Sequence, residues 1–226
     1  MTEQTSPACI GIILDGNRRW AKAKGIAALE GHTEGLNNLE RAVGWVRDAG
    51  VEHLVVYAFS TENWSRPQQE VSHLMGLILQ VAREQIHRLI EQKVRVQFIG
   101  QRERLSADVR AAVEQIEGDS KDGNFTLWVC LSYGGRAEIV EAARRLQQSG
   151  EEITEESFAK NLWSAGMPDP DIIIRTGAAE RLSNFLLWQS AYSELFFTDT
   201  LWPDFSEAEL KRILIEYGTR ERRRGK

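Results

Sequence analysis

Short apolar runs alternate with longer amphipathic segments along the 226 residues of this chain. The apolar runs have the length and branched side chains of buried strands, and lie at residues 10–14, 54–59, 94–99, 125–131 and 172–174. Apolar residues recur at helical spacing in the segments 33–49, 67–82, 136–147 and 206–217, and a further helix is expected after residue 106. This alternation predicts an α/β fold with a mostly parallel central sheet flanked by helices.

Residue types at the ends of the amphipathic segments support these helices. Pro67 suits the first turn of a helix, and Ser106 is expected to be an N-cap. Ser206 and Glu209 have the spacing of a capping box, and Gly50 is the expected stop of the segment that precedes it.

Polar clusters follow three of the predicted strands, at residues 15–20, 60–66 and 175–185. In open parallel sheets, ligands bind beyond the carboxyl ends of the strands. We therefore expect the three clusters to converge on one rim of the sheet.

The first cluster has the chemistry of a phosphate site. Gly16 allows the backbone to turn tightly, and the amides that open the following helix favour phosphate. Arg18 and Arg19 add charge-assisted donors, and Asp15 is the carboxylate that a Mg²⁺-diphosphate site needs. The alternative is that Asp15 and Gly16 form an ordinary turn and the arginines a solvated surface.

The second and third clusters carry more polar groups than a turn requires. Capping the helix after residues 60–66 needs only Ser65 and Pro67, so the other polar side chains of that loop are surplus to structure. In the third cluster, Arg175 and Arg181 could grip a second diphosphate, because guanidinium forks match phosphate oxygens. Surface salt bridges are the alternative there. Glu194 adjoins an apolar run and needs a partner, for which a metal or an arginine would serve.

Composition limits the classes of protein that remain. The net charge of −5 does not suggest a nucleic-acid binder, and only Cys9 and Cys130 are present, so no disulfide framework or zinc site is expected. The polar N-terminus lacks a signal peptide, and no apolar stretch approaches the roughly 20 residues that span a bilayer. We expect one cytoplasmic domain over residues 1–226, with residues 1–8 disordered and any membrane contact peripheral. P-loop, GxGxxG, HExxH, GxSxG and DDxxD motifs are absent from the sequence.

Seven stretches together resemble the undecaprenyl diphosphate synthase (isoprenyl transferase) family of cis-prenyltransferases. They are IILDGNRRWAK, EGH, VVYAFSTENWSRPQQEV, SYGGRAEI, IIIRTG, RLSNFLLWQSAYSELFF and LWPDF, and the resemblance runs from about residue 9 to the C-terminus. The resemblance implies an enzyme of isoprenoid biosynthesis that uses Mg²⁺ to extend an allylic diphosphate, here farnesyl diphosphate, with isopentenyl diphosphate. The product would be a poly-cis-prenyl diphosphate such as undecaprenyl diphosphate, the lipid carrier of cell-wall assembly. The family is homodimeric and houses the growing tail in an apolar tunnel, with the helix from residue 68 and the strand 125–131 as expected walls.

The resemblance also assigns roles to residues. Asp15 would hold Mg²⁺ with Glu194 as a second metal ligand, and Asn63 would act near the proton removed from isopentenyl diphosphate. The allylic diphosphate would lie against Gly16, Asn17, Arg18, Arg19, Trp20 and His32, and the closing loop would supply Ser60, Thr61, Glu62, Trp64 and Arg66. The isopentenyl diphosphate would contact Arg175, Arg181, Leu182 and Ser183, together with Arg223 and Gly225 of the neighbouring subunit.

The chain departs from the family pattern at several positions. Arg18 stands where glycine is usual and Ala28 where many members have an arginine, so Arg18 is a candidate replacement for that charge. Ala179 leaves out a carboxylate usual before Arg181, for which Glu180 is a candidate substitute, and the terminus reads Arg-Gly-Lys.

These departures keep other functions open. One alternative is head-to-middle coupling of two allylic units, as in lavandulyl-type synthases. Another is a short-chain synthase with Trp128 as the tunnel floor; the sequence does not fix the direction of that side chain, and we expect Trp128→Ala to lengthen the products. A non-catalytic subunit of a two-component prenyltransferase would lack Asp15 and much of the loop 60–66. A phosphatase-like α/β protein lacks a nucleophile motif here.

Overall fold

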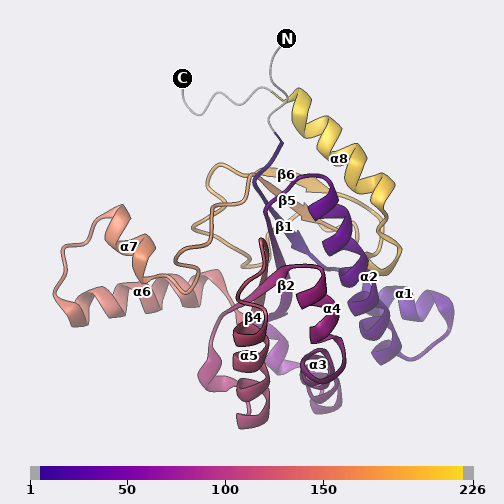
Figure 1. The fold of residues 1–226 in the computed structure, drawn as a ribbon, viewed down its shortest axis with the longest axis horizontal. Coiled ribbons are helices and arrows are strands. Elements are labelled where there is room, and N and C mark those ends of the chain that lie inside the picture. The colour runs from indigo at the N-terminus through magenta and orange to yellow at the C-terminus, as the bar shows by residue number, and fades with distance from the viewer. Residues whose placement is uncertain (1–5, 221–226) are drawn as a thin grey trace.

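The computed structural model describes residues 6–220 and contains one central sheet of six strands (Figure 1). The strands lie in the order β3-β4-β2-β1-β5-β6, and all five pairings between neighbours are parallel. Their bounds are β1 Cys9–Ile13, β2 His53–Ser60, β3 Val94–Ile99, β4 Phe125–Tyr133, β5 Ile172–Arg175 and β6 Glu194–Phe197. The predicted α/β class with a parallel sheet is confirmed.

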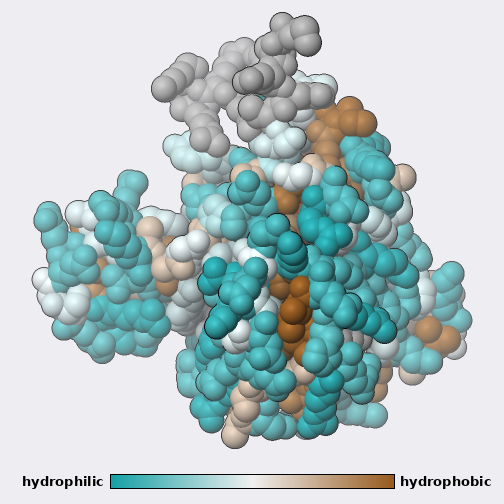
Figure 2. All heavy atoms as spheres, viewed as in Figure 1, coloured by the Kyte–Doolittle hydropathy of each residue, from teal (hydrophilic) through white to brown (hydrophobic). Residues whose placement is uncertain are grey.

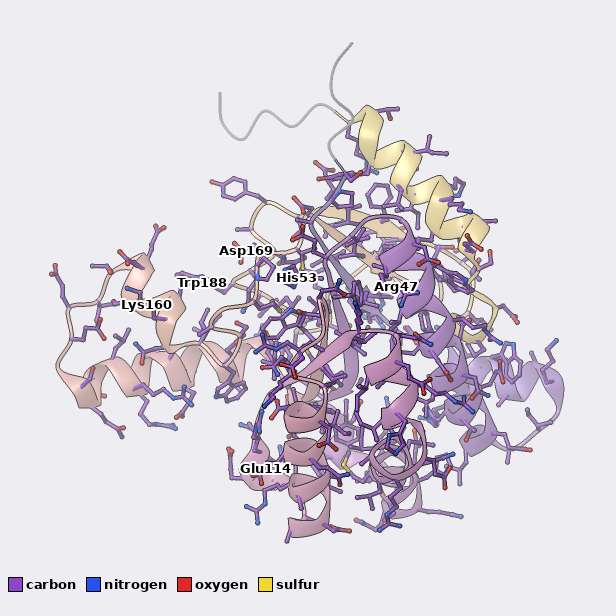
Figure 3. All side chains as sticks on the ribbon, viewed as in Figure 1. Arg47, His53, Glu114, Lys160, Asp169 and Trp188 are labelled. Atoms are coloured by element: carbon purple, nitrogen blue, oxygen red, sulfur yellow. The ribbon has the colours of Figure 1, made fainter. Side chains whose placement is uncertain are left out.

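Helices flank this sheet, and two of them form an arm. The helices are α1 Asn17–Lys24, α2 Ala28–Asp48, α3 Gln68–Gln80, α4 Ile86–Glu91, α5 Ala107–Asp119, α6 Gly135–Ser149, α7 Glu155–Asn161 and α8 Glu207–Thr219. Figure 1 shows α6 and α7 projecting to one side of the molecule. Trp188 lies at the base of this arm in Figure 3 and stacks on Phe158 of α7 at 4.6 Å between ring centroids, whereas Lys160 lies further out.

Short helical segments complete the chain. They are the 3₁₀ turns η1 Thr61–Ser65, η3 Arg102–Arg104 and η4 Trp202–Asp204, and the π-helical segment η2 Val81–Gln85. The η2 segment joins α3 to α4 without a break, so the predicted long helix after Pro67 continues to Glu91 with a change of pitch.

Helix ends follow the predicted capping residues. Ser106 is the N-cap of α5, and the Ser206 hydroxyl accepts the Glu209 amide at 3.3 Å. Helix α2 begins five residues before the predicted segment, because the Glu30 carboxylate accepts the Ala27 amide at 2.8 Å and fixes an earlier start.

Side chains alternate between the two faces of the sheet. On one face Ile10, Leu54, Val56 and Leu127 belong to a buried cluster that also takes in residues of α2, α5 and α8. The intervening residues, among them Cys9, Val55 and Cys130, pack on the other face with Phe185 and Leu186.

The start of the described chain is anchored to the rest of the protein. The predicted disordered segment, residues 1–8, extends too far, because Pro7 is buried and the Ala8 amide donates to Asp171 Oδ2 at 2.8 Å. Residues 1–5 lie outside the described part.

Figure 2 shows a mostly hydrophilic surface with a narrow apolar strip between α4 and α5. Within residues 6–220 no helix has the length and apolar character needed to cross a membrane.

Candidate active site

One large cavity opens at the carboxyl ends of β1, β2 and β5. Its volume is about 1180 Å³. The polar lining includes Asp15, Asn17, Arg18, Arg19, His32, Asn63, Arg66, Arg175 and Ser183, whereas the apolar lining comes from α2, α3, β3 and β4 and includes Leu36, Val43, Leu74, Ile78, Val96, Phe98, Leu127, Val129 and Leu131. The three polar clusters therefore converge on one rim, as predicted, and the cavity behind them suits a ligand with a charged head and a hydrocarbon tail.

Asp15 is fixed at the end of β1 by its own backbone. Its carbonyl accepts the Thr176 hydroxyl at 2.7 Å and the Trp202 amide at 3.0 Å. The next residue must be glycine: Gly16 has φ +120°, and an added Cβ would lie 2.9 Å from the Leu201 backbone. The chain then opens α1 at Asn17, and Gly16, Asn17, Arg18 and Arg19 at this end of the helix line the cavity.

The Asp15 carboxylate joins two arginines. Its Oδ2 lies 2.9 Å from Arg175 Nη2, and its Oδ1 lies 3.1 Å from Arg19 Nη2. Arg175 is only 4% exposed, and its Nη1 donates to Ser183 Oγ and to the Arg181 carbonyl, both at 2.6 Å. A buried guanidinium needs such partners, so Arg175 ties the first cluster to the third.

A second cluster of charged and titratable side chains surrounds the carboxylate of Glu70, at the start of α3. The buried Glu70 carboxylate meets His32 Nε2 at 3.1 Å and accepts Arg66 Nη1 at 2.9 Å, and Arg18 Nη1 lies 3.9 Å away. Burial lowers the pKa of His32 below its usual value, although the hydrogen bond to Glu70 opposes this. A neutral imidazole is thereby favoured beside the mouth of the cavity.

The loop 60–66 is held by one hydrogen bond within it and by hydrogen bonds to two other segments. Asn63 Oδ1 accepts the Ser60 amide at 3.1 Å, and Trp64 Nε1 donates to Ser132 Oγ at 2.9 Å. Glu62 Oε1 accepts Asn184 Nδ2 at 2.8 Å. Partial burial alone would raise the pKa of Glu62, but hydrogen bonds from its own backbone and from Asn184 lower it overall.

Most of the predicted site residues line the cavity, and several do not. Those in the lining are Asp15, Gly16, Asn17, Arg18, Arg19, His32, Ser60, Glu62, Asn63, Arg66, Arg175 and Ser183. The side chain of Trp20 is directed elsewhere, because its Nε1 donates to Asp204 Oδ1 at 2.8 Å. Thr61, Trp64, Arg181 and Leu182 lie in the same segments without lining the cavity, and Arg223 and Gly225 lie outside the described residues.

Glu194 is not brought to Asp15 within one chain. It begins β6 beside Ile172, at the amino end of the strands, whereas Asp15 follows their carboxyl end. Its carboxylate accepts Arg220 Nη1 at 2.8 Å. Within one chain Glu194 and Asp15 are therefore too far apart to share a metal, and the role of Glu194 as a metal ligand stays a prediction. Of the two partners named for Glu194, the structure supplies the arginine.

The donor set at the rim fits a metal that arrives with its substrate. Among the described residues no group of three or more His, Cys, Asp or Glu side chains could hold a metal. Asp15 offers one carboxylate at the mouth of the cavity. Mg²⁺ is commonly bound in this way, through one or two carboxylates while substrate phosphates and waters supply the remaining oxygens.

Some residues of the rim had no predicted role. Glu70, Arg136 and Asn184 all take part in its contacts, and the last two line the cavity. The sequence carried faint signals for them, since Glu70 lies one helical turn after Arg66 and Asn184 directly follows Ser183.

Trp128 lies on the opposite face of the sheet from the cavity. Its neighbours Leu127 and Val129 line the cavity, so the alternation of β4 directs Trp128 away, toward Val55 and Cys130. Its Nε1 lies 3.3 Å from Nδ1 of His53, which is labelled in Figure 3. Of the two directions that the sequence left open for Trp128, the structure has the one that points away from the cavity, so Trp128 does not floor it.

Neither cysteine is suited to nucleophilic catalysis. Cys9 and Cys130 are both fully buried, and burial raises the pKa of both thiols well above the usual range. A thiolate is therefore disfavoured at both positions.

Residues 13–225 match the family model described as "Putative undecaprenyl diphosphate synthase". The chain belongs to the undecaprenyl diphosphate synthase family. It is 46% identical to an isoprenyl transferase of Fusobacterium nucleatum, over 99% of this chain and 97% of that protein. It is 44% identical to an isoprenyl transferase of Thermus thermophilus, over 97% of this chain and 89% of that protein.

Two crystal structures of this family share the fold. Lavandulyl diphosphate synthase from Lavandula x intermedia, in complex with dimethylallyl diphosphate, matches with a TM-score of 0.93 and 34% identity over 98% of this chain and 99% of that one. A probable undecaprenyl diphosphate synthase from Campylobacter jejuni matches with a TM-score of 0.84 and 32% identity over 98% of this chain and 100% of that one. The chain is thus a prenyl-transferring enzyme, which sets aside the phosphatase and the non-catalytic subunit.

Proposed function

We propose that this member of the family is a magnesium-dependent cis-prenyltransferase that extends an allylic diphosphate with isopentenyl diphosphate. One observation supports this most: a single cavity joins a cationic rim to a deep apolar interior. The rim suits two diphosphates and the interior suits a growing hydrocarbon tail.

The allylic diphosphate would bind at the start of α1. The helix amides after Gly16 and the side chains of Arg18 and Arg19 provide donors there. Arg18 and Ala28 line the same cavity, which supports Arg18 as the replacement for the charge missing at Ala28.

The isopentenyl diphosphate would bind at the third cluster. Ser183 lines the cavity, and Arg175 lies behind it with Nη1 on Ser183 Oγ. Exposed Arg181 would extend the grip from the solvent side.

Asp15 would hold Mg²⁺ together with oxygens of the bound diphosphate. When bound, the ion neutralises charge on the leaving diphosphate. For Asp15 to take part, its ion pair with Arg175 must loosen, and a diphosphate near Arg175 would supply the replacement anion.

The chemistry follows from this placement. The bond between C1 and oxygen of the allylic diphosphate breaks, and Arg18 and Arg19 stabilise the departing charge. The isopentenyl double bond forms a new bond from its terminal carbon C4 to C1, and C2 of the isopentenyl unit, near Asn63, loses a proton to the released diphosphate to give the new double bond. The walls of the cavity exclude water from the allylic cation.

A homodimer is part of this proposal. The edge strand β6 exposes Leu195 and Phe197, at 37% and 36%, and Tyr192 lies just before it. Apolar side chains on an open sheet edge favour contact with a second copy. Arg223 and Gly225 would then belong to the isopentenyl site of the neighbour, and any membrane contact would come through the lipid product.

A second candidate is head-to-middle coupling of two allylic units. The high structural similarity to lavandulyl diphosphate synthase favours it. The intact loop 60–66 with Asn63 favours elongation instead, because loss of a proton from an isopentenyl unit belongs to that reaction.

Product analysis separates these functions. We would incubate the pure protein with Mg²⁺, radiolabelled isopentenyl diphosphate and farnesyl diphosphate, run a parallel reaction with radiolabelled dimethylallyl diphosphate alone, and then resolve the extracted prenols by chain length. Long prenols would support an undecaprenyl-type synthase, and short ones a short-chain synthase. Product formed only from dimethylallyl diphosphate, with no isopentenyl incorporation, would overturn elongation in favour of head-to-middle coupling.

A further inference from the structure

Asn184 links three segments that meet at the rim of the cavity. Its Nδ2 donates to Glu62 Oε1 at 2.8 Å, and its Oδ1 accepts the Arg136 amide at 2.8 Å. Its carbonyl accepts the Gly135 amide at 2.8 Å. One residue thus contacts the loop 60–66 and the start of α6, and it directly follows Ser183.

The backbone here is held in a conformation that needs external support. Ser183 and Asn184 have φ values of +49° and +69°, in the left-handed region that is costly for residues other than glycine. The bonds from Asn184 to Glu62 and to the first amides of α6 supply that support. Ser183 in turn accepts Arg175 Nη1, so its position depends on its neighbour.

Gly134 gives independent evidence that the loop 60–66 packs closely against Asn184 at the start of α6. A Cβ at this position would lie 2.6 Å from Thr61 Oγ1 and 2.7 Å from Asn184 Nδ2. No side chain fits there without separating the loop from Asn184.

We propose that Asn184 is a positioning residue that sets the loop 60–66, and with it Asn63, against the residues that grip isopentenyl diphosphate. The inference rests on the proposed function for its consequence in catalysis. Glu62 and Asn184 both line the cavity, so their bond spans the gap between the loop and the third cluster. Binding at Ser183 and proton loss near Asn63 concern the same isopentenyl unit, so their separation must be fixed.

The alternative is that Asn184 only caps α6, and Asn184→Asp separates the two roles. Aspartate keeps the oxygen that accepts the Arg136 amide and suits a helix N-terminus. It replaces the donor to Glu62 with a second carboxylate, so the two groups repel. A helix cap alone would leave this variant as stable and as active as the wild type.

We expect kcat/KM for isopentenyl diphosphate to fall by about 100-fold in Asn184→Asp at pH near 8, the scale of a misplaced reacting group. The KM for the allylic substrate and the melting temperature should change little. Activity should partly recover at lower pH, where one carboxyl of the pair takes up a proton. In the double variant with Glu62→Gln, the glutamine amide restores a donor facing the introduced aspartate. Its kcat/KM for isopentenyl diphosphate should be at least tenfold higher than that of Asn184→Asp. The single variant Glu62→Gln completes the double-mutant cycle.

Hydrogen exchange of the loop gives a readout independent of turnover. Amides of residues 60–66 should exchange faster in Asn184→Asp and return toward wild-type rates in the double variant. Wild-type kinetics and exchange rates in Asn184→Asp, with no rescue, would overturn the proposal. An inactive wild-type protein whose loop still responds to these variants would instead refute the proposed function while leaving the positioning role supported.

Discussion

At the scale of residues, the rim is organised around one buried cation. Arg175 binds Asp15 on one side and Ser183 on the other, so the carboxylate and the hydroxyl that we assign to different substrates share a single guanidinium. The rim is therefore held by an ion pair that, under the proposed function, rearranges when the substrates bind. Removing either end of the pair should affect both stability and function.

Asp15→Ala should reduce turnover by at least about 10²–10³-fold, the range for losing one group that stabilises transition-state charge. The fold should persist, but the free energy of unfolding should fall by about 1–3 kcal/mol because Arg175 loses an acceptor. Asp15→Asn keeps an acceptor oxygen, so it should lose turnover similarly and melt closer to the wild type. Steady-state rates and thermal melts check both. An Asp15→Ala enzyme with near-normal turnover would refute the metal role.

His32 should make stability depend on pH. Its folded pKa lies below the usual value of about 6.5, so the unfolded chain binds its proton first as the pH falls. The contribution is complete above about pH 6.5 and is lost below it, by about 1.4 kcal/mol for each pH unit until the folded pKa is reached. When the pH is lowered from about 7.5 to about 5.5, the melting temperature of His32→Gln should therefore fall by less than that of the wild type. Equal losses in the two proteins would contradict the neutral His32.

Site residues could be predicted where a side chain with suitable chemistry lies close to the end of a strand in the sequence. Asp15, Arg18 and Arg19 lie within six residues of the end of β1, Arg175 ends β5, and all four line the cavity. Trp20 did not, because its indole found Asp204 far along the chain. Glu194 did not, because its place depends on the register of β6, which local sequence does not specify.

At the scale of elements, the cavity is bounded by β3 and β4 and by the long helix from Gln68 to Glu91. Strand register orders the lining by depth: Leu131 lies near the carboxyl rim, Val129 further in, and Leu127 deepest, beside Val96. Both predicted walls, the helix after Pro67 and the strand 125–131, line the cavity.

Leu127→Ala should shift the products to longer chains, because it removes bulk from the deep part of the cavity. Trp128→Ala is the matched control: it changes the adjacent residue on the opposite face and should leave product lengths unchanged. Leu127→Phe should shorten the products and guards against loss of stability in the alanine variant, which we expect to be about 2–5 kcal/mol. A prenol ladder for each variant checks the set. A longer ladder from Trp128→Ala alone would contradict the assigned face.

Elements were more predictable than the directions of their side chains. Apolar runs located five strands to within two residues at each end, since buried parallel strands are continuous in hydrophobicity. The same continuity hid which face Trp128 occupies. Helix α7 was not predicted, because its seven residues are too few for a clear helical period.

At the scale of the whole molecule, β6 leaves one edge of the sheet open. Phe197→Glu should weaken the proposed dimer by at least about tenfold, since a charge would replace an apolar contact at its centre. Ile215→Glu on α8 is the control, because Ile215 is 63% exposed but lies on a different element. Sedimentation velocity over a dilution series measures both. A wild-type monomer at every concentration, or equal effects of the two variants, would count against β6 as the interface.

The geometry of the newly formed double bonds tests the central claim most directly. We would supply ¹³C-labelled isopentenyl diphosphate, farnesyl diphosphate and Mg²⁺, and record the ¹³C NMR spectrum of the purified product, with a chelator-treated reaction alongside. We expect linear chains whose new double bonds are cis, and no product with chelator. Trans double bonds, branched carbon skeletons, or equal product formation without the metal would contradict it.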